Sequence, residues 1–286
     1  MFTISRRHFL TACAGAAGSA LVVPAFTMAA ELNRGFEKTA PAYASGEELN
    51  RQRNIWVMEV SLKPMRMIFI NRVDPKTGQT KKDQIWYLAY RAINRPLPGR
   101  KADDDVTPQN EVEPLPGQDK FIPELTLVTY DDPKSQIPSG VYHDVILPAA
   151  DRRINAIERR PGDDAVFLDS VSVVRDLPEP VDASAEVQPY VYGVATWKNV
   201  DPDADFFKVI LRGFSNGYQE VPGPDGKPIV TRKVLVQKFI RRGDRFDPNQ
   251  AEFLFDGNPT WEYQPDEVPT GAAATTDAAV NASPAN

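Results

Sequence analysis

Cysteine is almost absent from this chain of 286 residues, and its single copy is Cys13. Cys13 lies within an apolar N-terminal stretch of the kind that is removed on export. The chain beyond residue 30 therefore has no disulfide, no thiolate nucleophile and no thiolate zinc site. Iron–sulfur clusters and CxxCH haem attachment are excluded for the same reason.

Histidine is nearly as scarce, because His8 lies in the same stretch and only His143 remains beyond it. Asp144 follows directly, but neighbours in a strand point to opposite faces, so Asp144 cannot orient His143 as in a Ser-His-Asp triad. The chain also lacks a GxGxxG fingerprint and a GxxxxGK[ST] phosphate loop. We predict a surface position for His143, no catalytic residues, no cofactor and no enzymatic activity.

Positive charge is in the minority, with 33 Lys and Arg against 39 Asp and Glu. Losing Arg6 and Arg7 with the N-terminal stretch would lower the net charge from −6 to −8. Because an acidic protein repels phosphate backbones, we predict no nucleic-acid partner. A hydrophobic fraction of 42% indicates an ordinary globular protein, and the 26 prolines predict many loops.

The N-terminus itself carries a specific pattern, Ser5-Arg6-Arg7-His8-Phe9-Leu10, followed by an apolar run to Val23 and small residues at Ala29 and Ala30. The pattern resembles the twin-arginine (Tat) export signal of bacterial proteins, with Arg6, Arg7, Phe9 and Leu10 as its recognised residues. The resemblance implies export of a folded protein and cleavage near Ala29 and Ala30. An uncleaved anchor and a lipoprotein site at Cys13 are the alternatives. We expect no membrane span after cleavage.

The rest of the chain has the pattern of many short strands. We predict a long hairpin over residues 64–93, in which the 85–93 strand is apolar on both faces and therefore central. One short helix is expected near 148–160, where Ala150, Ile154 and Ile157 form an apolar stripe. The prediction is a mainly β fold of antiparallel sandwiches. Residues 85–94 resemble a middle strand of bacterial immunoglobulin-like modules, which implies an immunoglobulin-like β-sandwich.

Breaks in this pattern predict the organisation of the chain. We expect two sandwich regions divided at a proline-rich segment, with one elaborated sandwich as the alternative. The expected segments are a signal peptide at 1–30, an extended arm at 31–53, a first β-sandwich region at 54–176, a linker or crossing loop at 177–189, a second β region at 190–263 and a disordered tail at 264–286.

Alternating aspartates form the best metal candidate. Asp201, Asp203 and Asp205 precede a predicted strand and could supply hard oxygen ligands to calcium. An EF-hand is excluded, since Phe206 and Arg212 stand where its glycine and glutamate would be. The competing and preferred interpretation is a turn in which the aspartates cap backbone amides. The run 103–105 allows the same two interpretations.

The function that fits these observations best is a non-catalytic binding or scaffolding protein of the periplasm or cell envelope, because β-sandwiches present binding surfaces. Its partner would be an envelope protein or a polysaccharide. The alternative is a carbohydrate-active hydrolase or a calcium-assisted sugar-binding domain, which needs a pair of carboxylates or an aromatic platform. Four tryptophans could form such a platform or pack in the core, and these are Trp56, Trp86, Trp197 and Trp261.

Overall fold

A computed structural model of the chain describes residues 32–73, 76–99, 120–135, 137–223, 226–241 and 252–265. By their internal contacts, residues 1–33 and Arg34–Asn286 form two units. The predicted export residues Arg6, Arg7, Phe9, Leu10, Ala29 and Ala30 lie outside the described residues, as does the aspartate run at 103–105. In the described part, no helix is long and apolar enough to cross a membrane.

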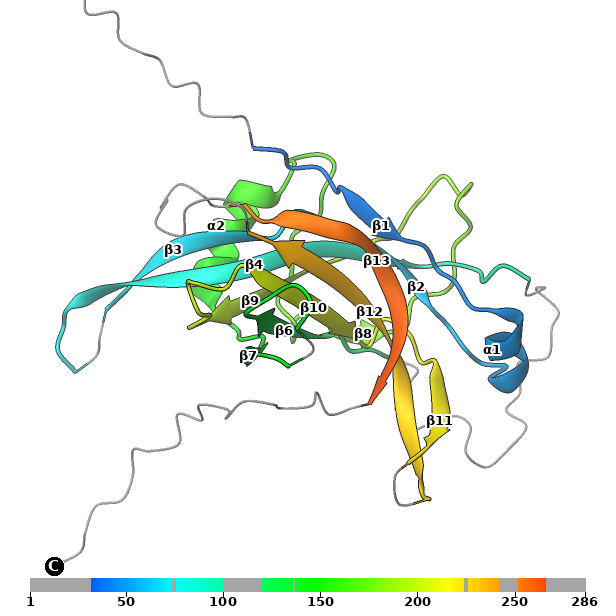
Figure 1. The fold of residues 1–286 in the computed structure, drawn as a ribbon. Helices are drawn as coiled ribbons and strands as arrows, with labels where there is room; N and C mark the ends of the chain where they lie inside the picture. The colour runs from blue at the N-terminus through cyan, green and yellow to red at the C-terminus, as the bar shows by residue number, and fades with distance from the viewer. Residues whose placement is uncertain are drawn as a thin grey trace, which may run out of the picture. The chain divides into compact units, whose positions relative to one another are not determined.

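The first sheet is built around one long strand (Figure 1). Along one edge, β4 pairs with β2 and then β3, and along the other edge it pairs with β9, while β1 extends the sheet from β2. All of these pairs are antiparallel, as the predicted hairpin over 64–93 requires. The strands are β1 (Lys38–Ala40), β2 (Met58–Leu62), β3 (Arg66–Val73), β4 (Thr80–Asn94) and β9 (Val191–Lys198).

The second sheet has the order β11-β12-β10-β6-β7, with β13 on the free edge of β12. Its strand pairs are also antiparallel. The strands are β6 (Glu124–Tyr130), β7 (Gly140–His143), β10 (Phe206–Arg212), β11 (Tyr218–Pro222), β12 (Pro228–Ile240) and β13 (Leu254–Pro265). A separate pair joins β5 (Lys120–Phe121) to β8 (Arg175–Asp176).

The two sheets share one hydrophobic core, which the alternation of side chains along each strand creates. Trp86 and Leu88 of β4 point into this core, and Phe207 and Val209 of β10 meet them from the second sheet. The intervening Tyr87 points to the other face of the first sheet, into a second apolar cluster. The predicted antiparallel, mainly β sandwich is therefore confirmed, and β4 is central and covered on both faces.

The expected boundary at 177–189 does not separate two sandwiches. From beyond it, β9 pairs with β4 and β10 pairs with β6, so strands from both regions build the same two sheets. The segment is a crossing loop rather than a linker, because the first sheet holds it. The Asn94 side chain donates to Pro178 O at 2.8 Å, and Arg95 donates to Val181 O at 3.1 Å.

Helix α2 (Pro148–Glu158) confirms the predicted short helix, and it buries Ala150 and Ile154 against the outer face of the first sheet. The expected extended arm at 31–53 is wrong in part, since it contains β1 and helix α1 (Gly46–Arg51). A capping box starts α1: Glu48 N donates to Ser45 Oγ, and Ser45 N donates to Glu48 Oε2. The expected disordered tail begins too early, because residues 264–265 belong to β13.

Candidate functional site

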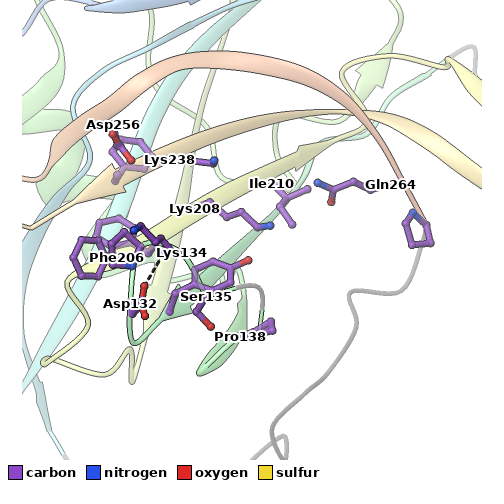
Figure 2. Close-up of a pocket in the computed structure, with 15 residues that line it drawn as sticks. Asp132, Lys134, Ser135, Pro138, Phe206, Lys208, Ile210, Lys238, Asp256 and Gln264 are labelled. Atoms are coloured by element: carbon purple, nitrogen blue, oxygen red, sulfur yellow. Dashed lines mark hydrogen bonds between the residues drawn. The ribbon is translucent and has the colours of Figure 1, made fainter.

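A cavity of about 460 Å³ lies on the outer face of the second sheet, the face turned away from the shared core. It is bounded by β10, β12, loop residues 132–135 and 138, and the end of β13 (Figure 2). Strand alternation points Lys208 and Ile210 of β10 outward, and both line the cavity. Two core residues, Phe207 and Phe239, also border it.

The lining of the cavity combines an apolar floor with a charged rim. Ile210 is buried within a small apolar cluster that also contains Val128, Val234 and Val236. Tyr130 borders the same space and packs on this cluster. The charged groups on the rim come from several elements, and they are Asp132, Lys134, Lys208, Lys238 and Asp256.

Two of the rim lysines are direct neighbours across the sheet. Lys208 of β10 pairs in register with Lys238 of β12, and both side chains line the cavity. Lys208 Nζ lies 5.3 Å from the centre of the Tyr130 ring, a cation–π contact. Within the described residues, neither ammonium group has a carboxylate within 4.0 Å. The cavity thus presents two adjacent ammonium groups in a chain whose overall charge is negative, and Asp132 and Asp256 lie on the same rim.

The loop beneath the cavity is ordered by its own hydrogen bonds. Asp132 Oδ1 accepts from Lys134 N at 2.7 Å, the contact drawn in Figure 2, and Asp132 O accepts from Ser135 N at 3.1 Å. Ser135 Oγ accepts from Ile137 N at 3.2 Å. These hydrogen bonds hold residues 132–135 in place beside the cavity.

The sequence-predicted candidates lie elsewhere. His143 is exposed at the end of β7, with Nδ1 3.5 Å from Thr126 Oγ1, so its predicted surface position is confirmed. The tryptophans do not form a platform: Trp56, Trp86 and Trp197 are buried in the core, and Trp261 packs against it.

The aspartate loop between β9 and β10 has the hydrogen bonds of a turn. Asp201 Oδ1 accepts from Asp203 N at 2.9 Å, and Asp205 O accepts from Arg241 N at 2.8 Å. The Arg241 guanidinium also donates to Pro202 O, which fixes the loop to the end of β12. Across the described ranges, no three His, Cys, Asp or Glu side chains are grouped to hold a metal ion. The calcium prediction gains no support from this loop.

Sequence reasoning overlooked a Gly-x-Ser-x-Gly spacing at residues 213–217. In hydrolases this spacing presents a nucleophilic serine on a strand-to-helix turn. Here it joins β10 to β11, two strands, and Ser215 is buried. Ser215 Oγ donates to Trp56 O at 2.8 Å and accepts from Gly217 N at 2.9 Å. The contacts of Ser215 are those of a structural turn that ties the two sheets together.

A buried ion cluster under α2 was also missed. Lys63, with no exposed side-chain surface, donates to Arg34 O at 2.5 Å and to Glu158 O at 2.7 Å. Glu158 Oε1 accepts from Arg66 at 2.6 Å and from the Tyr87 hydroxyl at 2.7 Å. Burial lowers the pKa of Lys63. Because these groups are sealed from solvent and bind one another, the cluster fastens α2 and the Arg34 segment to the first sheet.

Two carboxyl groups, Asp151 of α2 and Asp169 beyond it, have pKa values that are shifted in opposite directions. Burial raises the pKa of Asp151 to about 6, and the charge of Asp169 adds to this effect. Burial also acts on Asp169, but hydrogen bonds from Ser172 and Val171 outweigh it and lower the pKa of Asp169. Carboxylates with opposite shifts are the pattern of an acid and a base in hydrolases. The bonds of Asp169 also have a structural role, since they hold the turn at 169–173.

The cavity residues carried a weak signal in the sequence. The alternation of Phe207, Val209 and Leu211 with Lys208 and Arg212 is visible in the strand pattern, but it looks like an ordinary solvated face. Only the register with β12 brings Lys238 beside Lys208.

No family model, curated protein or solved structure matches this chain. The immunoglobulin-like resemblance of residues 85–94 therefore stays a prediction.

Proposed function

We propose that this chain is a non-catalytic binding or scaffolding protein of the periplasm or cell envelope, exported by the Tat pathway, and that the cavity on the second sheet is its binding site. The observation that carries the proposal is the pairing of Lys208 with Lys238 at a cavity with an apolar floor. Ligand sites in proteins are typically concave, largely apolar and equipped with a few placed polar groups.

The surrounding architecture supports a binding role. The floor rests on a buried cluster and on a sheet whose other face belongs to the shared core, so the site sits on a rigid base. The lysines contribute charge, and residues 132–135 contribute a wall in which Asp132 accepts from the Lys134 backbone. The expected partner is an envelope polysaccharide or protein with acidic groups.

The test is retention of envelope material by the immobilised protein. Cell-envelope extract of the host is separated into protein and polysaccharide fractions and passed over wild type, Gln264→Trp and Thr80→Trp. Gln264 is half-buried and lines the cavity, so tryptophan there fills the space, whereas Thr80 is exposed on the first sheet. We expect retention by wild type and Thr80→Trp that Gln264→Trp loses. Equal retention by all three proteins, or none by wild type, would overturn the proposal.

The second candidate function is a carbohydrate-active hydrolase, and the opposite pKa shifts of Asp151 and Asp169 favour it. Its test is the release of reducing ends from envelope polysaccharides by wild type and Asp151→Asn. Release that the substitution abolishes would establish a hydrolase and refute the non-catalytic proposal. No release by wild type would eliminate the hydrolase.

A further inference from the structure

The lysine pair in the cavity is an unfavourable arrangement of like charges. Lys208 and Lys238 are directly opposite each other in antiparallel strands, where like charges destabilise the sheet. Asp256 is the cross-strand partner of Lys238, yet in the described structure no ion pair forms between them within 4.0 Å. An anion between the two ammonium groups would remove their repulsion and accept hydrogen bonds from both.

The rest of the lining indicates what the anion is attached to. Ser135, Gln264 and the two rim aspartates, Asp132 and Asp256, place donors and acceptors around the opening. A ligand that satisfies both kinds of group carries hydroxyls, which donate and accept. An acyl chain offers no hydrogen bond to these polar groups, whereas a hydroxyl can donate to the aspartates and accept from the Gln264 amide.

Tyr130 supplies an aromatic surface in the cavity. Its half-buried ring borders the cavity, and Phe206 is its cross-strand neighbour on β10. Aromatic rings provide a flat apolar surface with a polar rim, suited to the C–H face of a sugar ring. A cavity of about 460 Å³ falls within the size range of small-molecule sites.

We infer that the cavity binds an anionic sugar, whose carboxylate or phosphate lies between Lys208 and Lys238 and whose ring lies against Tyr130. This inference rests on the proposed function and names the ligand class for the same site. It identifies the partner as an acidic envelope glycan, recognised through one charged unit.

Isothermal titration calorimetry on the full chain tests the inference with defined probes. The probes are a disaccharide ending in glucuronate, glucose 6-phosphate, the uncharged maltose, and octanoate as an acyl carboxylate. We expect at least one anionic sugar to bind at least about tenfold more tightly than maltose and octanoate, since one charge-assisted hydrogen bond is worth about that factor. The two anionic sugars distinguish a carboxylate from a phosphate. Binding should weaken as salt concentration rises.

Single substitutions locate the anion. Lys208→Met and Lys238→Met should each weaken binding about tenfold, because each removes one charged donor. Lys227→Met is the matched control, since Lys227 is exposed outside the cavity lining, and it should bind like wild type. Melting curves of the three variants verify that each is folded.

The inference would be overturned by equal binding of maltose, by binding of octanoate alone, or by unchanged affinity in both lysine variants. Absence of binding by both anionic sugars would overturn it too. If neither anionic sugar binds but Gln264→Trp still abolishes retention of envelope material, the ligand class is wrong and the proposed binding site is retained. If retention is also unaffected, both proposals fail.

Discussion

Replacing Glu48 should show how strongly helix α1 is held to the second sheet. Its carboxylate accepts from Lys233 Nζ at 2.6 Å, from the Tyr263 hydroxyl at 2.5 Å and from Ser45 N at 2.7 Å. Helix α1 is thereby fastened to β12 and β13. Burial raises the pKa of Glu48, but these hydrogen bonds and the charge of Lys233 outweigh it and lower the pKa from 4.5 to about 2.

The magnitude follows from linkage. A carboxyl group whose pKa is depressed on folding stabilises the protein above its unfolded pKa, and loses that stabilisation as pH falls through its folded pKa. At about 1.4 kcal/mol per pKa unit, Glu48 contributes about 3 kcal/mol at pH 7 and about half of that at pH 3. Burial lowers the pKa of Lys233, so the lysine offsets part of this contribution.

The perturbation is Glu48→Gln, and the assay is urea unfolding at pH 7 and pH 3 with linear extrapolation. We expect a loss of about 3 kcal/mol at pH 7 that shrinks to about 1.5 kcal/mol at pH 3. Glu47→Gln is the control on the same helix: its side chain is 87% exposed in a pair with Arg51, and its loss should stay below about 1 kcal/mol. Equal losses in both variants, or a loss from Glu48→Gln that is independent of pH, would refute the reasoning.

Three further predictions concern export, acidity and the buried cluster. Replacing Arg6 and Arg7 together by lysine should retain the protein in the cytoplasm, and export at the wild-type level, seen by immunoblotting of cell fractions, would contradict the signal. Asp151→Asn should stabilise the protein by about 1–2 kcal/mol at pH 7, after allowance for the partial exposure of Asp151. Because the pKa of Asp151 is raised to about 6, urea titrations should show that this gain in stability vanishes below about pH 4. Glu158→Gln should cost about 3 kcal/mol, because it removes the carboxylate 2.6 Å from the buried Arg66 while Glu252 at 3.0 Å remains, and calorimetry should show a melting temperature lower by roughly 10 °C.

Local patterns in the sequence were enough to predict the mainly β class and the central strand. The 85–93 segment is apolar on both faces because Trp86 and Leu88 serve the shared core while Tyr87 and Ala89 serve the cluster under α2. A strand that is paired along both edges and buried on both faces is apolar on both faces, whichever strands pair with it. The helix at 148–158 was equally visible from its stripe of apolar residues.

The sequence pattern could not predict which strands pair when they lie far apart along the chain. Whether β9 joins β4 or starts a new domain depends on contacts between segments about a hundred residues apart, and no local feature specifies them. The same limit hid Lys63, which looks like a surface lysine until Glu158 and Asp164 are seen beside it. Helix α1 was missed for a different reason, since the Ser45–Glu48 capping box is legible in the sequence and was overlooked.

The two outer faces of the sandwich show why the ligand site is assigned to the second sheet. On the first sheet, α2 covers the face, and each buried cation there has its carboxylate: Lys63 lies 3.4 Å from Asp164, and Arg66 lies 2.6 Å from Glu158. On the second sheet, Lys208 and Lys238 border open space and, in the described residues, have no such partner. The same residue types on the same kind of face are paired with carboxylates in one case and, in the described residues, have no carboxylate within 4.0 Å in the other. A buried cation that already has its counter-ion holds the fold together, whereas paired cations at a cavity provide the charge that recognises a ligand.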